Sequence, residues 1–529
     1  MLDVLFENAR LIDGSGNPWY KGDVGIKGDS IKLISHTIEK PAQKTIDIEG
    51  SFLAPGFIDT HSHSDLMILK ESDRPEKIKQ GVTTEVLGQD GVAPAPVPNQ
   101  HTDFWKDYNK GLNGKLSGEW TFSSMGDYLG EIDRNTITNI TSLVPHGALR
   151  LDSVGLENRD ASDQELDQMK KSLAKAMDQG GVGLSTGLIY TPCTFAPTQE
   201  LVELCKVVSR KGGIFVVHMR NEGSWIFDAL EEVILIGREA QVPVHISHLG
   251  AQSKKIWGEG EKIVETILRA RDRGLDVTCD QYPYRAGSTL LSALIPPWVF
   301  EKHSEDLPQA LQAPETRTKI LDYLKDHTAE EWDSHFQRVG AENIYISSVN
   351  TEANRELQGK SLPEAAEMRG EGIHEAVLNI LIEEDMEASM TVFLCQEEDV
   401  VEIMQSQFQM FCTDGLLGGF PHQRVYGTYP RVLRKYVREE SALTLEQAIR
   451  KMTSLPANRL GFEDRGLVKQ GFKADLTVFD LDKVNDRATY ENPIQFPEGI
   501  THVLINGKLV VENEEIVDSK PGRVLYSKR

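Results

Sequence analysis

Eight short apolar runs, separated by amphipathic helical patterns, constrain this chain more than any other feature of its sequence. Each run ends in polar or histidine-containing residues, and the runs cover 56–63, 81–90, 141–147, 181–190, 213–219, 242–248, 274–282 and 408–414. Strands that alternate with helices pair in parallel, so we expect an α/β fold in which residues 56–464 form a (β/α)8 barrel of the TIM type. An open, doubly wound sheet is the alternative.

The two ends of the chain have a different pattern. Residues 1–55 and 465–529 consist of short strand-like runs with hairpin signals between them, at Lys27-Gly28-Asp29-Ser30 and at Asn506-Gly507. Two β-rich ends that enclose an α/β middle predict one composite β-domain, a β-sandwich assembled from both termini.

Two connections are too long for a simple strand–helix unit. Residues 91–140 are rich in Pro, Asn, Gly and Trp, and residues 283–407 contain several helical patterns. Both follow predicted barrel strands at their carboxyl ends, where barrel enzymes build lids and substrate pockets. We therefore expect 283–407 to be an insertion within the barrel.

Charge and cysteine content narrow the class of protein. With 57 basic and 81 acidic residues the formal net charge is −24, which argues against partners that are polyanions, such as nucleic acid or an anionic membrane. The five cysteines form no CxxC pair, and the first residues lack the basic and apolar parts of a signal peptide. We expect a cytoplasmic protein with a small-molecule substrate; the oligomeric state stays open.

Histidines and an aspartate stand at the ends of several predicted strands. His61 and His63 are two residues apart on the first strand, His218 ends the fifth, His248 ends the sixth, and Asp414 ends the eighth. The carboxyl ends of barrel strands meet at one rim, so these side chains form a candidate site for one or two transition-metal ions, zinc first. Histidines scattered over the core and surface are the alternative.

Asp414 is the candidate catalytic group of this site. A metal ion lowers the pKa of water to about 7, and a carboxylate beside that water can take its proton and later deliver it to a leaving nitrogen. His245, three residues before His248, is expected to point to the opposite face of its strand, toward a helix.

Several segments resemble the N-acyl-D-amino-acid deacylase (D-aminoacylase) family of the amidohydrolase superfamily. They follow the order of the family over most of the chain: APGFIDTHSHSD, GVTTEVLGQDG, HMRNEG, DQYPYRAGSTLLSALIPPW, CTDGLLGG and PHQRVYGTYPRVLRKYVRE. The resemblance implies a barrel with a lid insertion after the seventh strand, and zinc-dependent hydrolysis of N-acyl-D-amino acids to a carboxylate and a D-amino acid.

The resemblance also implies roles for individual residues. His218 and His248 would hold the tightly bound zinc ion, and His61 and His63 would belong to a second, weaker metal position. The residues in the positions that hold the α-carboxylate of the substrate are Tyr190, Tyr282 and Ser288.

Two departures from the family pattern affect these roles. Asp90 stands where the family commonly has a metal-bridging cysteine, so a harder carboxylate would replace the thiolate; a structural role for Asp90 is the alternative. Gly250 stands where members often have a lysine that pairs with the substrate carboxylate. Lys254 or Lys255 could replace that lysine, or the carboxylate could rely on Tyr282, Ser288 and Arg220.

The sequence gives only a weaker indication of which side chain the substrate amino acid carries. Residues 286–298 contain no cation, which favours hydrophobic D-amino acids over acidic ones. Two alternatives stay open for the function: another hydrolase of C–N bonds, acting on a cyclic amide or a dipeptide, or a non-catalytic scaffold.

Overall fold

The eight apolar runs become parallel strands around one barrel in the computed structural model. These are β6 (Phe57–Asp59), β7 (Val82–Leu87), β8 (Asn139–Ser142), β10 (Gly183–Gly187), β11 (Ile214–His218), β12 (Val244–Ile246), β13 (Val277–Gln281) and β17 (Gln409–Phe411). β9 (Val144–Pro145) continues the third strand and pairs with β10. A parallel bridge between Ser62 and Gly415 joins the ends of the first and eighth strands. The predicted barrel is confirmed.

The structure describes residues 1–70, 74–99, 102–113, 120, 122–133, 135–303, 306–325, 333–417, 421–517 and 519–527. The last residues of the CTDGLLGG segment, Gly418 and Gly419, lie outside these ranges. Among the described residues, none of the helices combines the length and the apolar character that crossing a bilayer requires.

Amphipathic helices cover the outside of the barrel. The best-formed are α6 (Asp163–Asp178), α7 (Thr198–Arg210), α8 (Ile226–Ala240) and α9 (Gly260–Asp272). In α6 the Ser162 side chain accepts the backbone N–H of Glu165, and the Glu165 carboxylate accepts that of Ser162, so a capping box starts the helix. Its buried residues, Met169, Leu173 and Ala176, follow the helical period and pack toward the strands.

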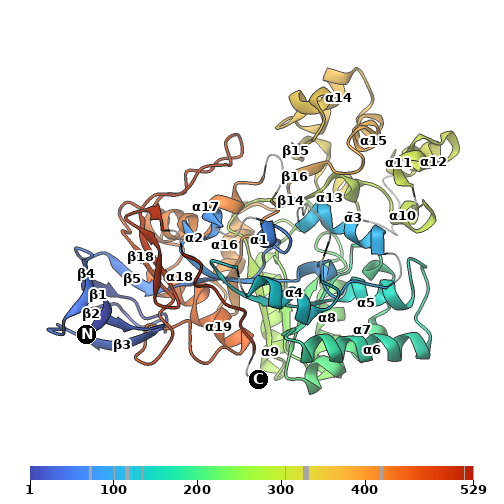
Figure 1. Cartoon of the computed structure of the whole chain (residues 1–529). Coiled ribbons are helices and arrows are strands. Elements are labelled where there is room, and N and C mark those ends of the chain that lie inside the picture. The colour runs from blue at the N-terminus through green and yellow to red at the C-terminus, as the bar shows by residue number, and fades with distance from the viewer. Residues whose placement is uncertain are drawn as a thin grey trace.

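Both ends of the chain contribute to one nine-stranded sheet, at the left of Figure 1. Its strands are β1 (Leu2–Leu11), β2 (Tyr20–Lys27), β3 (Ser30–Ser35), β4 (Ala42–Asp47), β5 (Phe52–Pro55), β18 (Leu476–Phe479), β19 (Ile500–Ile505), β20 (Lys508–Glu512) and β21 (Glu515–Ile516). The antiparallel pairing of β5 with β18 joins the two termini. Asn506 and Gly507 both have positive φ, 47° and 76°, which the tight turn between β19 and β20 requires. The domain boundaries stay a prediction.

The segment between the seventh and eighth barrel strands forms a small α/β subdomain above the barrel, which we call the lid (Figure 1). Its antiparallel sheet consists of β14 (Ala286–Leu290), β15 (Ile344–Ser348) and β16 (Ser389–Phe393). Its helices are α10 (Pro297–His303), α11 (Leu307–Gln312), α12 (Pro314–Lys325), α13 (His335–Val339), α14 (Leu362–Arg369) and α15 (Ile373–Glu383). The next helix, α16 (Glu397–Gln405), packs against α9 and β17 and belongs to the outer layer of the barrel.

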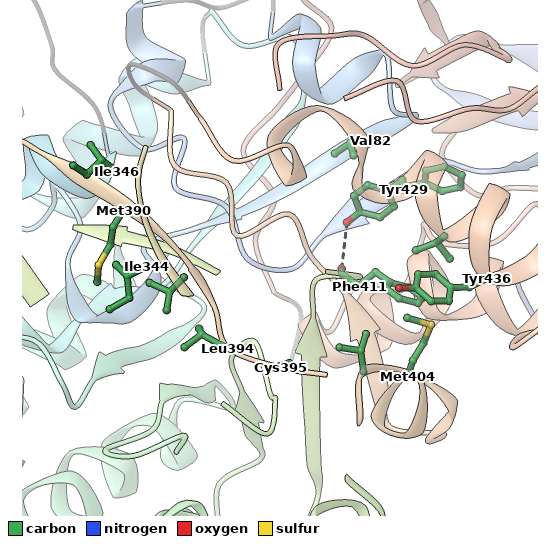
Figure 2. Packing of buried hydrophobic residues seen from close by; sticks show 14 of the residues in the cluster. Val82, Ile344, Ile346, Met390, Leu394, Cys395, Met404, Phe411, Tyr429 and Tyr436 are labelled. Atoms are coloured by element: carbon green, nitrogen blue, oxygen red, sulfur yellow. Dashed lines mark hydrogen bonds between the residues drawn. The ribbon is translucent and has the colours of Figure 1, made fainter. Parts of the chain in front are cut away.

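The lid and the eighth barrel strand share one hydrophobic core. Figure 2 shows Ile346 and Met390 of the lid sheet on one side, and Phe411 of β17 among Tyr429 and Tyr436 on the other. The Tyr429 hydroxyl donates to the Phe411 carbonyl at 3.2 Å. The lid is therefore anchored by burial at the strand that leads to Asp414.

The remaining helices connect these parts. They are α1 (Met67–Lys70), α2 (Pro75–Ile78), α3 (Thr102–Asn113), α4 (Met125–Ile132), α5 (His146–Ser153), α17 (Arg424–Arg431), α18 (Leu445–Met452) and α19 (Ser454–Leu460). A short 3-10 turn, η1 (Gln89–Gly91), follows β7, and the π-helical η6 (Val432–Glu439) follows α17.

Candidate metal centre and active site

The carboxyl ends of the barrel strands bring the predicted metal ligands together. His61 and His63 follow β6, Asp90 lies in η1 after β7, His218 is the last residue of β11, and His248 follows β12. All five side chains are nearly inaccessible to solvent. Two overlapping groups could each hold a metal ion, His61–His63–Asp90 and Asp90–His218–His248.

The first group has the dimensions of a metal site. The two Nε2 atoms of His61 and His63 are 3.2 Å apart, and they lie 3.6 and 3.5 Å from Asp90 Oδ2. Zinc–nitrogen bonds of 2.0–2.1 Å in a tetrahedron put neighbouring ligand atoms about 3.3 Å apart. The three donors therefore fit one small divalent cation without rearrangement.

The second group uses the same aspartate. His218 Nδ1 lies 3.8 Å from Asp90 Oδ2, and His248 Nε2 lies 3.9 Å from Asp90 Oδ1. Asp90 Oδ1 and His218 Nδ1 are buried without a hydrogen-bond partner in the part of the chain that the structure describes. Buried polar atoms are nearly always satisfied, so these atoms fit a cation that Asp90 shares between the two groups.

Three residues of the site have backbone in the left-handed region. The φ angles of Asp90, His248 and Asp414 are 56°, 35° and 45°. Residues other than glycine adopt this region rarely, and such strain clusters at functional sites. At each point the strand has ended, and the sharp turn directs the side chain over the barrel opening.

A fully buried ionic network lies beneath His61 and His63. Lys77 Nζ, from α2, donates to Asp59 Oδ2 at 2.6 Å, to Ser62 Oγ at 3.1 Å and to Thr413 Oγ1 at 2.8 Å. Glu85 of β7 lies 3.5 Å from the same Nζ and accepts from the Ser62 hydroxyl at 2.8 Å. This network holds the loop between the two histidines and the residue before Asp414.

The expectation that His245 points toward a helix is wrong. The strand period places it opposite His248, but its Nε2 lies 2.9 Å from Asp280 Oδ2, and that carboxylate also accepts the hydroxyl of Thr60 from the first strand at 3.0 Å. Thr60 and Asp280 meet across the barrel, so His245 points into its interior. The left-handed turn at His248 breaks the alternation on which the expectation rested. Asp280 Oδ1 also accepts the His248 backbone N–H at 2.6 Å.

Asp414 lies against the first group of ligands. Its Oδ1 is 3.5 Å from His61 Nε2 and 3.3 Å from His63 Nε2, and its Oδ2 is 2.9 Å from Arg424 Nη1. Burial would raise the pKa of Asp414, but the charges of Arg424 and His61 outweigh it and hold the pKa below its ordinary value. Asp414 is thus an ionised carboxylate at the edge of the metal centre.

A cavity opens in front of these residues. Tyr190, Tyr282 and Ser288, which the resemblance places at the substrate, all line it. The sequence interpretation missed Arg424, whose guanidinium lies 4.4 Å from the centre of the Tyr282 ring. The signal for Arg424 was its place in the PHQRVYGTYPR segment, directly after the last barrel strand.

The structure does not bring Arg220 to this cavity. Its guanidinium donates to Glu232 at 3.0 and 3.1 Å and to the carbonyl oxygens of Thr194 and Ala196. Its side chain lines a neighbouring cavity instead. Because these acceptors already hold Arg220 in place, its position two residues after His218 does not make it a substrate ligand.

The position of the family lysine leaves little room for a side chain. A Cβ atom on Gly250 would lie 3.0 Å from Cys395 Sγ, so that sulfur would have to shift by a few tenths of an ångström. Lys254 lies at the surface, in an ion pair with Glu342 at 2.7 Å. The cations that line the cavity are instead Arg338 and Arg424.

Comparison with known proteins gives the family. A model of the amidohydrolase family matches residues 44–511. The chain belongs to the amidohydrolase family. It is 34% identical to D-aminoacylase of Alcaligenes xylosoxydans xylosoxydans over 526 residues, which cover 99% of this chain and 97% of that protein.

Solved structures of such amidohydrolases have the same fold. The crystal structure of D-aminoacylase superimposes with a TM-score of 0.84 at 32% identity, covering 99% of this chain and all of the other. N-acyl-D-glutamate deacylase from Bordetella bronchiseptica, complexed with zinc and a phosphonate that mimics the tetrahedral intermediate, gives 0.83 at 31% identity, with 99% of each chain covered.

Proposed function

We propose that this amidohydrolase is a metal-dependent N-acyl-D-amino-acid deacylase, which hydrolyses the amide bond to a carboxylate and a D-amino acid. One observation supports this most: two groups of imidazole ligands share Asp90, and a carboxylate paired with an arginine faces them in one cavity. Relatives at 32–34% identity include D-aminoacylase, N-acyl-D-glutamate deacylase and N-acyl-D-aspartate deacylase.

The metal part of the proposal is zinc, one or two ions per chain. His218, His248 and Asp90 would hold one ion, and His61, His63 and Asp90 the other. Imidazole and carboxylate donors suit zinc, with other divalent transition metals as alternatives. Such an ion supplies Lewis-acid chemistry: it lowers the pKa of water and polarises an amide carbonyl.

Asp414 is the proposed proton carrier. Its Oδ1 faces the first metal group, while Arg424 holds its Oδ2 and fixes the orientation of the carboxylate. An ionised carboxylate in that place accepts a proton from the attacking water and donates it to the amine nitrogen that leaves. The C–N bond breaks, and the amine departs with the added proton.

Arg424 is the proposed anchor of the substrate's α-carboxylate, together with Tyr282 and Ser288. Arg424 Nη2 donates to the Ser288 carbonyl at 3.2 Å, so the guanidinium is held at the cavity wall. An adjoining cavity is lined by apolar residues such as Leu290, Ile295 and Phe300, together with Asp333, His335 and Arg338 at one side. We extend the proposal to apolar side chains of the substrate on this ground.

The test is release of free amine from matched N-acetyl-D- and N-acetyl-L-amino acids by zinc-reconstituted protein. Turnover of the D series alone is expected, with apolar side chains preferred. Asp414→Asn should lower kcat by about 10²–10⁴-fold while zinc stays bound. Turnover of cyclic amides or dipeptides instead would overturn the proposal in favour of another C–N hydrolase, and indifference to both zinc and Asp414→Asn would indicate a scaffold.

A further inference from the structure

A second buried carboxylate lies behind the imidazoles of His218 and His248. Glu222, four residues after His218, is 3% exposed. Its Oε1 is 3.0 Å from His248 Nδ1, and its Oε2 is 3.7 Å from His218 Nε2. These are not the nitrogens that face Asp90, which are His218 Nδ1 and His248 Nε2. Each imidazole therefore lies between two carboxylates.

This arrangement has a chemical consequence for a metal ligand. A neutral imidazole binds a cation through one nitrogen and carries its proton on the other. A carboxylate that accepts that proton fixes both the tautomer and the orientation of the ring. Glu222 Oε1 is close enough to His248 Nδ1 to accept that proton, whereas Glu222 Oε2 lies beyond hydrogen-bond distance of His218 Nε2 and favours the orientation of that ring by its charge.

The loop that carries Glu222 is held rigidly. Asn221 Oδ1 accepts the backbone N–H groups of Gly223 and Trp225, both at 2.9 Å. The Glu222 carbonyl accepts the Gln252 N–H at 3.0 Å, which ties the loop after the fifth strand to the loop after the sixth. The carboxylate is thus set by both loops that carry the two histidines.

We propose that Glu222 is the positioning residue of the His218–His248 half of the metal centre. It selects Nδ1 of His218 and Nε2 of His248 as the ligand atoms and directs them toward Asp90. This inference rests on the proposed metal-dependent function. It differs from a role as a ligand, because Glu222 faces the nitrogens turned away from Asp90.

The experiment measures metal binding without substrate. Zinc affinity of wild-type protein and of Glu222→Gln is determined by competition with a chromophoric chelator, and the absorption spectrum is recorded after loading with Co²⁺. We expect one metal equivalent to bind about 10–100-fold more weakly in Glu222→Gln. The Co²⁺ spectrum at saturation should be unchanged, because the set of ligand atoms is retained.

Two results would overturn the proposal. An unchanged affinity would show that the imidazoles need no partner on this side, and a changed Co²⁺ spectrum would make Glu222 a ligand. Glu232→Gln is the matched control, since Glu232 pairs with Arg220 of the same loop region and contacts neither histidine; it should bind zinc like wild type.

Two further readouts keep the test decisive. If Glu222→Gln does not fold, as judged from thermal unfolding of the metal-free proteins, Glu222→Asp replaces it. The shorter side chain keeps the charge but cannot reach both rings, so weaker binding is again expected. A wild-type protein that binds metal but hydrolyses no N-acyl-D-amino acid would refute the proposed activity and leave the role of Glu222 standing.

Discussion

The two halves of the metal centre are supported in different ways. His61 and His63 rest on the buried network of Lys77, Asp59 and Glu85, which reaches from the first strand to the residue before Asp414. The imidazoles of His218 and His248 are backed by the carboxylate of Glu222, which also lines the substrate cavity, and Asp280 holds the backbone of His248. One half is thus tied to the stability of the barrel, and in the other half Glu222 is the carboxylate that faces both rings.

The ionic network shows why the first half is coupled to the fold. Burial would lower the pKa of Lys77, but the carboxylates of Asp59 and Glu85 outweigh it and raise the pKa, so the ammonium stays charged. A charge without its partners inside a protein is very costly. Damage to this half should therefore appear as lost stability, and damage to the other half as lost metal affinity.

Asp90 belongs to both halves, and its removal should give the largest effect. Asp90→Ala is expected to weaken zinc binding at both positions by more than about 100-fold, beyond the effect of removing a residue that only supports a ligand. Activity should disappear with the metal. The measurement is zinc per chain after dialysis against buffered zinc solutions.

Asp90→Cys is the control for that change. A thiolate is a softer ligand that binds zinc well, so metal content should be retained and the order of preference among metals should shift. If Asp90→Ala keeps one zinc ion with wild-type affinity, Asp90 is not shared and the two halves are separate sites.

Lys77→Met tests whether the His61–His63 half of the metal centre is coupled to the stability of the protein. The substitution removes the cation that contacts Asp59 and leaves Glu85 with Arg74 at 4.0 Å, and it should lower the free energy of unfolding by about 3–5 kcal/mol. Urea denaturation of the metal-free protein measures this. Glu222→Gln in the same experiment should cost less, since its contribution is to ligand geometry.

Lys79→Met provides the comparison for Lys77→Met on the neighbouring turn. Lys79 is partly exposed and its ammonium lies 5.1 Å from the ring centre of Phe496, so its loss should cost about 0.5–1 kcal/mol. Equal destabilisation by the two substitutions would contradict the ionic support of the first half.

The smallest effects come from the arginines beside each half. Arg424→Lys should lower kcat/KM for N-acetyl-D-amino acids by about 10–100-fold, because a bond between charged groups is lost. Arg220→Lys should change it by less than about threefold, since its partner is Glu232 rather than substrate. Substrates whose α-carboxylate is converted to an amide test the anchor: the Arg424→Lys loss should be smaller with them, because only the contact of Arg424 with Asp414 is then affected. An equal loss on both substrates would contradict the carboxylate anchor.

The barrel strands and the residues at their carboxyl ends were the part of the structure that the sequence predicted best. Each of the eight apolar runs became a barrel strand, and His61, His63, Asp90, His218, His248 and Asp414 meet at one rim. Parallel barrels impose this geometry, so the position of a polar residue at the end of a strand is enough to place it. The hairpin at Asn506-Gly507 was also predicted, because Asn and Gly adopt the positive φ that its tight turn requires.

The supporting residues could not be predicted in this way. Glu222, Arg424 and Lys77 lie on loops and short helices, where no period determines the direction of a side chain. Arg220 shows the converse error: it follows a strand end, but Glu232 from the next helix holds it outside the cavity. His245 was misplaced because strand alternation was extended through the left-handed turn at His248.

The left-handed backbone at Asp90 and Asp414 has a free-energy cost that matters if these two residues are exchanged. Such backbone costs an ordinary residue about 1–3 kcal/mol, whereas glycine adopts it freely and asparagine tolerates it. Glycine would relieve this backbone cost at either point, but at Asp414 it would also leave Arg424 buried without its carboxylate partner. The left-handed backbone at these two aspartates is therefore a cost that the chemistry of the site explains and the strands alone do not.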